Sequence, residues 1–479
     1  MTSAADRTTS EPARQHYGIT FAILCLAGGS YALLQSTVAP ALPQIQDELG
    51  ASSTATAWIF TGYLLSASVL TPIVGRLGDM FGKARVLVLS LTVLSLGVLL
   101  AALSTSVEML IVARVIQGSG GAIFPLAFGI IRDEFPARRA AQGIAMISAI
   151  LGIGGGLGIV LAGPIIENLN YHWLFWLPLV ACVITTVAAI FFVPESPVKS
   201  PGRVDWAGAA LLSTWLVLVL LGISQTASWG WGDPRVLGLL AAGFATLAVW
   251  VRFEARAREP LVDMAVMRIR GVWTVNAAAF LVGAGMYSSF ILVPEFTETP
   301  ASTGYGYGAS VTEAGLFLLP ATVAMMIVSP IAGSLASRIG PRVTLIAGCL
   351  ITALSFTLMA VAHGPHFNMY VATALMGAGI GLAFSSLANL IVEAVDPTQT
   401  GVATGMNTVM RTLGGSVGGQ IGASLLAGTV VAAGLPTEEG FTLAFGFGAA
   451  ACVLAAIASF AVPTRRRPSF RPVPLAATE

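Results

Sequence analysis

Long apolar runs recur along the whole chain and are interrupted by few charges. A helix that crosses a lipid bilayer needs about 20 mostly apolar residues. The runs are continuous and show no polar–apolar alternation over about ten residues, which argues against membrane-spanning strands. The pattern predicts fourteen spanning helices, at residues 18–42, 55–75, 85–104, 108–131, 141–166, 172–193, 206–225, 235–252, 272–296, 312–335, 343–362, 367–394, 401–431 and 441–463.

Four polar segments separate or flank these helices. Residues 1–17 form a polar tail, and the run after it is longer than a signal-peptide core of about 7–15 residues, so we expect a retained first span. Residues 194–205 are a proline-rich linker, and the basic segment 254–271 is expected to lie along the inner membrane surface. The basic tail 464–479 is expected to contact anionic lipid or to anchor the topology.

The composition identifies lipid as the solvent. Apolar residues make up 56% of the 479 residues and charged residues only 10%, against about 25% in ordinary soluble domains. The net charge of +1 gives no field that would attract nucleic acid. Cys25, Cys182, Cys349 and Cys452 all lie in apolar runs without metal-ligand spacing. We therefore expect no metal site and no cofactor.

The basic residues predict the topology. With the N-terminus in the cytoplasm, 21 of the 24 Lys and Arg residues fall in cytoplasmic segments. Arg235 falls outside, and Arg114 and Arg411 lie within helices. The acidic residues show no such bias. This positive-inside asymmetry supports fourteen spans with both termini in the cytoplasm of a cell that carries the protein in its plasma or inner membrane.

An internal repeat divides the chain into two halves. "TPIVGRLGDMFGKAR" (71–85) returns as "SPIAGSLASRIGPR" (329–342) about 258 positions later, "QGSGGA" (117–122) as "MGAGIG" (376–381), and "GGGLG" (154–158) as "GGSVGG" (414–419). We predict six-helix bundles at 18–193 and 272–463, with a linker at 194–271 that holds an inserted helix pair, 206–225 and 235–252. Repeated halves that rock about a central site are the build of secondary transporters.

The first copy of the repeated turn predicts a conformational latch. Its glycines permit close helix approach and a tight bend, and its bases keep the turn on the cytoplasmic side. Asp79 has three candidate partners: Arg85, Arg132, or the N-terminus of a helix in the other half. The latch is predicted to comprise Gly75, Asp79, Gly82, Lys83 and Arg85.

At these residues the chain resembles the major facilitator superfamily. "GRLGDMFGKAR" is similar to the family's signature loop after its second helix, and "RVIQGSGGAI" (114–123) to its fourth-helix signature. Fourteen helices with a central inserted pair resemble the drug/proton antiporter branch. The resemblance implies alternating access and proton-coupled export of hydrophobic or amphiphilic drugs and metabolites, including antibiotics.

Two positions depart from that branch. Its first helix usually carries an acidic residue where this chain has Leu34 in "LLQSTVAPALP". Its fifth-helix motif normally ends in a glycine pair, whereas "GPIIEN" keeps Gly163 and Pro164 but places Glu167 and Asn168 there. The first departure removes the usual coupling carboxylate, and the second weakens the signature of export.

Two arginines within helices are candidate site residues. An unpaired charge at the centre of a membrane costs about 2.5–3.5 kcal/mol on insertion scales, so each must face protein or water. Arg114, with Gln117 beside it, is either a proton relay or substrate contact, or a structural hydrogen-bond hub. Arg411, one turn after Asn407, is either a cavity residue that attracts an anionic or carbonyl-bearing substrate, or a packing contact.

No acidic residue lies near the middle of a predicted helix. Proton-coupled carriers commonly use a carboxylate buried in the membrane. The best candidates are Glu295, in "ILVPEF", and Glu167, and each is alternatively an ordinary residue of the outer rim. Aromatic residues such as Tyr31 and Tyr287 are candidates for lining an apolar cavity, but such residues more often serve simple packing or an interface belt, so none is selected individually.

The sequence therefore predicts an all-α membrane transporter and no enzyme. The first hypothesis is proton-coupled efflux of amphiphilic compounds by a monomer, with a small molecule, protons and the lipid bilayer as partners. The alternative is a carrier for one anionic metabolite, with Arg114 and Arg411 as the attracting charges. A membrane enzyme is disfavoured because no HExxH, GxSxG or Walker motif occurs, and a sensor without turnover is disfavoured by the repeated halves.

Overall fold

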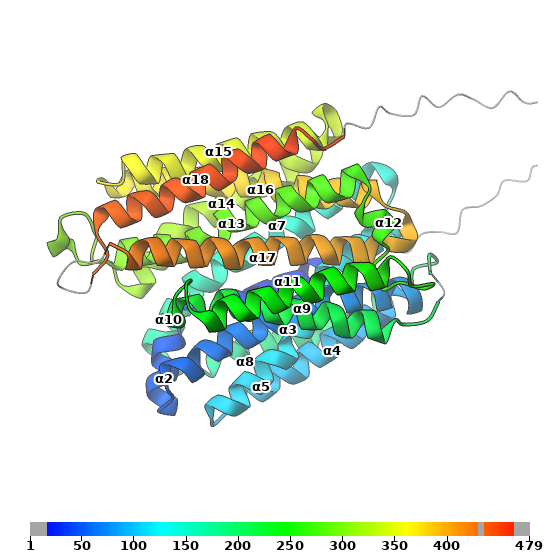
Figure 1. Cartoon of the computed structure of the whole chain (residues 1–479), viewed down its shortest axis with the longest axis horizontal. Coiled ribbons are helices and arrows are strands. Elements are labelled where there is room, and N and C mark those ends of the chain that lie inside the picture. Colours follow the sequence, from blue (N-terminus) through cyan, green and yellow to red (C-terminus); the bar gives the residue numbers. More distant parts are fainter. Residues whose placement is uncertain (1–16, 201, 430–434, 464–479) are drawn as a thin grey trace, which may run out of the picture.

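The computed structural model describes residues 17–200, 202–429 and 435–463, so the tails predicted at 1–17 (but for Tyr17) and 464–479 lie outside the described residues. The described chain is a bundle of long helices (Figure 1). The N-terminal half consists of α1 (Tyr17–Ser36), α2 (Leu42–Leu49), α3 (Ser53–Phe81), α4 (Lys83–Ala102), α5 (Val107–Gln117), η1 (Gly118–Ala122), α6 (Ile123–Glu134), α7 (Ala137–Asn168) and α8 (Trp173–Phe192).

The inserted pair and the C-terminal half follow. The insert comprises α9 (Trp206–Ser224), α10 (Thr226–Trp229), α11 (Pro234–Glu254) and the short α12 (Met264–Met267). The C-terminal half comprises α13 (Arg270–Glu298), η2 (Ala301–Thr303), α14 (Val311–Ile339), α15 (Pro341–Val361), α16 (His366–Ala394), η3 (Pro397–Gln399), α17 (Thr400–Ala427) and α18 (Glu438–Ser459).

The all-α membrane fold is confirmed. Thirteen spans in the described chain are long and apolar enough to cross a bilayer, with α5, η1 and α6 counting as one. The 28-residue α17 is long enough as well, but it carries Arg411 and many glycine and threonine residues. Together they account for the fourteen predicted segments.

Two predicted helices differ in detail. The first was expected to run to residue 42, but α1 ends at Ser36 and α2 begins separately, because Pro40 and Pro43 lack the N–H that would continue the ladder. The fourth was expected to be continuous, but a 3₁₀ segment interrupts it at Gly118–Ala122. There a Cβ on Gly118 would lie 2.6 Å from the backbone nitrogen of Ala67, so the small residues bring α3 against this segment.

The halves meet along two seams. In the first seam α3 packs on α17, and in the second α7 packs on α14. At the first seam a Cβ on Gly75 would lie 2.6 Å from the carbonyl oxygen of Gly401. At the second a Cβ on Gly333 would lie 3.0 Å from the Cα of Gln142. Glycine therefore lets the backbones approach at matching positions of the repeat.

The repeated turns also share a backbone conformation. Gly82, between α3 and α4, has φ 116° and ψ 131°, and Gly340, between α14 and α15, has φ 95° and ψ 143°. Residues with a Cβ rarely adopt this region. We call the end of the bundle that carries these two turns the basic end.

The inserted pair covers one seam. Leu212, Trp215 and Leu216 of α9 belong to one apolar cluster with Ile73 of α3 and Met406 of α17. Figure 1 shows α9 and α11 lying beside α3 and α17. The insert therefore closes the α3–α17 seam from the side.

Candidate functional site

Asp79 joins the two halves at the basic end. Its carboxylate is fully buried and accepts hydrogen bonds from the backbone N–H groups of Gly401 and Val402, each at 3.1 Å. These groups open α17, where the helix dipole favours a negative charge. Hydrogen bonds to a charged group contribute about 1.5–3 kcal/mol each. Of the three partners considered for Asp79, the structure therefore shows the helix N-terminus of the other half.

Of the other residues of the predicted latch, Gly75 packs against Gly401 of the other half, whereas Gly82, Lys83 and Arg85 contact their own half or the linker after α8. Lys83 is buried, and its Nζ lies 2.7 Å from Oδ2 of Asp133 and 3.9 Å from Oδ1 of Asp79. Arg85 is exposed and pairs with Glu195 at 3.5 Å rather than with Asp79. A Cβ on Gly82 would lie 2.5 Å from the Glu195 carboxyl carbon.

The linker after α8 is tied to this cluster. Glu195 accepts hydrogen bonds from the backbone N–H groups of Ala84 and Arg85, both at 3.3 Å, at the start of α4. Ser196 donates to Asp133, and the backbone N–H of Ser200 donates to the carbonyl oxygen of Asp79 at 2.7 Å. The linker therefore braces the Gly82 turn from outside the bundle.

Further polar contacts close the basic end between the halves. Arg132, at the end of α6, donates to Thr400 Oγ1 at 2.7 Å and to the carbonyl oxygen of Val395 at 2.8 Å. Asn389 of α16 donates to the carbonyl oxygen of Ala141 at 3.2 Å. Asp396 lies exposed in the connection between α16 and α17. Hydrogen bonds from the backbone N–H and the hydroxyl of Thr398 lower the pKa of Asp396, so this carboxylate stays ionised.

Arg114 is the centre of a buried hydrogen-bond network. Its side chain is fully buried. It donates from Nε to the carbonyl oxygen of Ile59 at 3.3 Å, and from Nη1 to the carbonyl oxygen of Leu34 at 3.0 Å and to Gln117 Oε1 at 2.8 Å.

The network ties three further helices to α5. Gln117 extends the network by donating from Nε2 to the carbonyl oxygen of Gly97 at 3.0 Å. The Arg114 guanidinium lies 4.1 Å from the ring centre of Tyr63. Nη2 of Arg114 is buried without a partner in the described chain. Arg114 thus holds α1, α3, α4 and α5 together and keeps one donor free.

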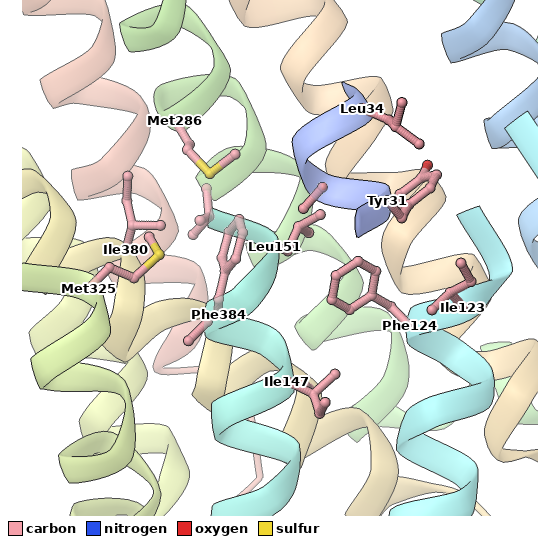
Figure 2. Close-up of a cluster of buried hydrophobic side chains, with 14 of the residues drawn as sticks. Tyr31, Leu34, Ile123, Phe124, Ile147, Leu151, Met286, Met325, Ile380 and Phe384 are labelled. Carbon is pink, nitrogen blue, oxygen red and sulfur yellow. The ribbon is translucent and has the colours of Figure 1, made fainter. Parts of the chain in front are cut away.

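A small cavity lies between the halves. Its described lining includes α1, α3, α6 and α7 of one half and α13 and α17 of the other. Figure 2 shows Tyr31, Phe124 and Leu151 of the N-terminal half near Phe384 and Met286 of the C-terminal half. The lining residues are Tyr31, Gln35, Leu64, Ala67, Ser68, Thr71, Gly121, Phe124, Leu151, Tyr287, Thr408, Val409, Arg411 and Thr412.

Arg411 lines this cavity and Asn407 does not. The Arg411 side chain is 8% exposed, and its guanidinium lies 4.6 Å from the ring centre of Phe384. Asn407 lies outside the described lining and donates to Asn276 Oδ1 of α13 at 2.9 Å. The two residues share a helix face in the sequence, but only the arginine faces the space between the halves.

The helix-5 motif lies at the opposite end of the α7–α14 seam. A Cβ on Gly163 would lie 2.8 Å from the Cα of Thr312. Thr312 donates to Glu167 Oε1 at 2.8 Å, so this exposed carboxylate bridges the halves. Pro164 lies within α7 without ending it. Glu295 is exposed on α13, and the structure does not bring it to Glu167, Arg114 or the cavity lining.

Several site residues were not selected from the sequence. Asp133, Glu195 and Glu254 are carboxylates at the basic end, and each binds a specific partner there. The sequence did hold a signal for them. These acidic residues lie in or beside segments that the positive-inside rule assigns to the cytoplasm. Tyr31 and Tyr287 line the cavity, but an isolated tyrosine in an apolar run has no distinguishing pattern.

Comparison with known proteins agrees with this arrangement. A family model described as the Major Facilitator Superfamily matches residues 24–419, and it also matches residues 278–478. The tetracenomycin C resistance and export protein of Streptomyces glaucescens is 29% identical over 377 residues, covering 78% of this chain and 69% of that protein. The multidrug transporter protein MdtP of Bacillus subtilis is 28% identical over 375 residues, covering 78% and 68%.

The architecture also matches a solved structure. The human organic anion transporter MFSD10 (TETRAN) superposes with a TM-score of 0.66 at 15% identity, covering 92% of this chain and 98% of that one. At this identity the similarity concerns the fold alone.

Proposed function

This chain belongs to the major facilitator superfamily, and from that premise we propose that it exports amphiphilic small molecules across the plasma or inner membrane by alternating access. The relatives are multidrug and antibiotic-resistance transporters by name. The observation that carries the proposal is the central cavity between the repeated halves. It combines apolar walls with hydroxyl and amide groups, as sites for small amphiphiles do.

In the proposed cycle the basic end faces the cytoplasm and opens to admit substrate. The contacts of Asp79 and Arg132 with the start of α17 exist only when this end is closed. Such contacts bias the equilibrium between inward-open and outward-open states. The inserted pair α9 and α11 seals the α3–α17 seam against lipid as the halves move, and one chain supplies a complete path.

Protons are the proposed driving ion, and Glu167 and Glu295 are the proposed coupling carboxylates. Glu167 is supported by its contact with Thr312 across the α7–α14 seam. Protonation would remove the negative charge of the acceptor and weaken this bond. Glu295 is supported only by its position near the end of α13.

Reconstitution in liposomes tests the proposal. Purified protein is incorporated, a pH gradient is imposed, and ethidium and a panel of neutral and anionic dyes are followed by fluorescence. We expect gradient-dependent flux, reduced in Glu167→Gln or Glu295→Gln and unchanged in Asp47→Asn, which alters an exposed carboxylate on α2. Flux that does not depend on the pH gradient would rule out proton coupling. The absence of flux for every compound would rule out the transport function.

A further inference from the structure

Arg411 presents an unsatisfied donor to the central cavity. Its side chain is more than nine-tenths buried and lines the space between the halves. Its Nε is buried without a hydrogen-bond acceptor in the described chain. Buried polar groups are almost always paired, so an exception of this kind calls for a partner that binds from outside the protein.

The surroundings supply little compensation for the charge. No carboxylate occurs among the described residues that line the cavity, and no described carboxylate lies within 4 Å of the guanidinium. Its described neighbours are the ring of Phe384, at 4.6 Å, and Tyr287, whose neutral hydroxyl is a hydrogen-bond partner for the guanidinium. An aromatic face stabilises a cation without neutralising it. The cavity therefore keeps a positive charge at one wall.

The rest of the lining complements an anion attached to an apolar body. Ser68 is buried, and its hydroxyl also lacks a partner in the described chain. Gln35 and Tyr287 line the same cavity, and Gln35 Nε2 donates to the Tyr287 hydroxyl at 3.5 Å. Both side chains also carry N–H or O–H groups that can donate to a ligand. Leu64, Phe124, Leu151 and Val409 supply an apolar part of the wall, and threonine side chains also line the cavity.

From this arrangement we infer that the exported substrate is an amphiphilic organic anion whose acid group binds Arg411. The inference rests on the proposed export function and specifies its substrate. An acid oxygen accepts from the free Nε and neutralises the buried charge, which a neutral carbonyl cannot do. Rings or alkyl groups of the substrate contact the apolar wall. The positive charge of Arg411 would repel a cationic drug.

Binding of two matched probes to the purified full-length protein tests the inference. Dansylglycine carries a carboxylate on an aromatic body, and dansylglycinamide is the same molecule with a neutral amide. We expect dansylglycine to bind at least tenfold more tightly, measured by the rise in dansyl fluorescence. Arg411→Gln should abolish the difference and Arg411→Lys should retain part of it. Arg235→Gln, which removes an exposed arginine, should leave the difference unchanged.

The outcomes separate this inference from the proposed function. Equal affinity for the two probes, no binding of dansylglycine, or a preference that survives in Arg411→Gln would overturn the anion site. If Arg411→Gln does not fold, Arg411→Lys takes its place as the test of the guanidinium. A preference for dansylglycine as large as that of the native protein would then overturn the role of the guanidinium. If the protein transports ethidium in vesicles but does not prefer dansylglycine, the export function stands and the anion site is rejected. If it transports no compound in vesicles, the export function itself is rejected.

Discussion

At the scale of single residues, the buried charges are the most informative feature. Arg114 and Lys83 are both fully buried, yet they differ in how they are compensated. Lys83 pairs with Asp133, whereas Arg114 relies on two backbone carbonyls, Gln117 and the ring of Tyr63. Leu34, at the position where the resemblance led us to expect an acid, offers Arg114 its carbonyl oxygen.

Arg114→Ala is expected to abolish transport. The change leaves the carbonyls of Leu34 and Ile59 and the amide of Gln117 without their donor, and lost hydrogen bonds to a charged group cost about 1.5–3 kcal/mol each. Flux in proteoliposomes should fall by about tenfold or more, and the melting temperature in detergent should fall with it. Val112→Ala, on the exposed face of α5, is the control. Near-normal flux in Arg114→Ala would refute the prediction.

Asp79→Asn is expected to slow transport without unfolding the protein. An amide has a single acceptor oxygen and no charge, so it cannot match the carboxylate at the start of α17. The equilibrium should shift toward an open basic end. A cysteine at the cavity residue Thr408 should then react faster with a maleimide added from that end. Unchanged flux and labelling would end the idea of a latch, and Asp47→Asn is the matched control.

At the scale of elements, the seams depend on glycine. The α3–α17 seam brings Gly75 and Gly401 into backbone contact, and Gly405 lies against the backbone of Pro72 in the same seam. Glycine in a helix interior is less favourable than alanine by up to about 1 kcal/mol. The seam therefore gives up helix stability in exchange for a close approach between the halves.

Gly75→Ala is expected to strengthen α3 and still impair transport. The added Cβ would lie 2.6 Å from the Gly401 carbonyl oxygen, so the seam cannot close at the basic end. Gly238→Ala on α11 makes the same helix-favouring change where no atom lies within 4 Å, and it should leave flux intact. Loss of flux in both variants, or in neither, would show that the contact between the halves has no part in transport.

At the scale of the whole molecule, the repeat makes the two seams counterparts. α3 contacts α17 and α14 contacts α7, so the second helix of each half packs on the fifth of the other. The symmetry is incomplete, because the position of Asp79 in one half is occupied by Ser337 in the other. Among the described residues, the inserted pair adds to the asymmetry by packing over the α3–α17 seam.

Cysteine labelling in cells tests this arrangement. Arg85→Cys and Arg342→Cys should react with a membrane-impermeant maleimide only after permeabilisation, since both turns lie at the basic end. Asp233→Cys, at the opposite end, should react without it. The native background should be low, because Cys182, Cys349 and Cys452 are buried and Cys25 is partly buried. Labelling of the two turns from opposite sides of the membrane would contradict the fold of repeated halves.

Local pattern alone determined the number of spans, the repeat, the inserted pair and the position of the glycine turns. These features depend on apolar length and on residues adjacent in the chain, so they can be read without knowing what packs against them. The breaks after Ser36 and at Gly118 were missed because the apolar signal continues through prolines and glycines that bend the chain.

The partners of the charged residues were decided only by the tertiary structure. Asp79 binds groups 322 and 323 positions away, and three partners were equally compatible with its local sequence. Arg411 and Asn407 are one turn apart, yet one lines the cavity and the other binds Asn276. Side-chain direction and burial depend on how whole helices pack, and no periodicity within one helix specifies the rotation of its neighbours.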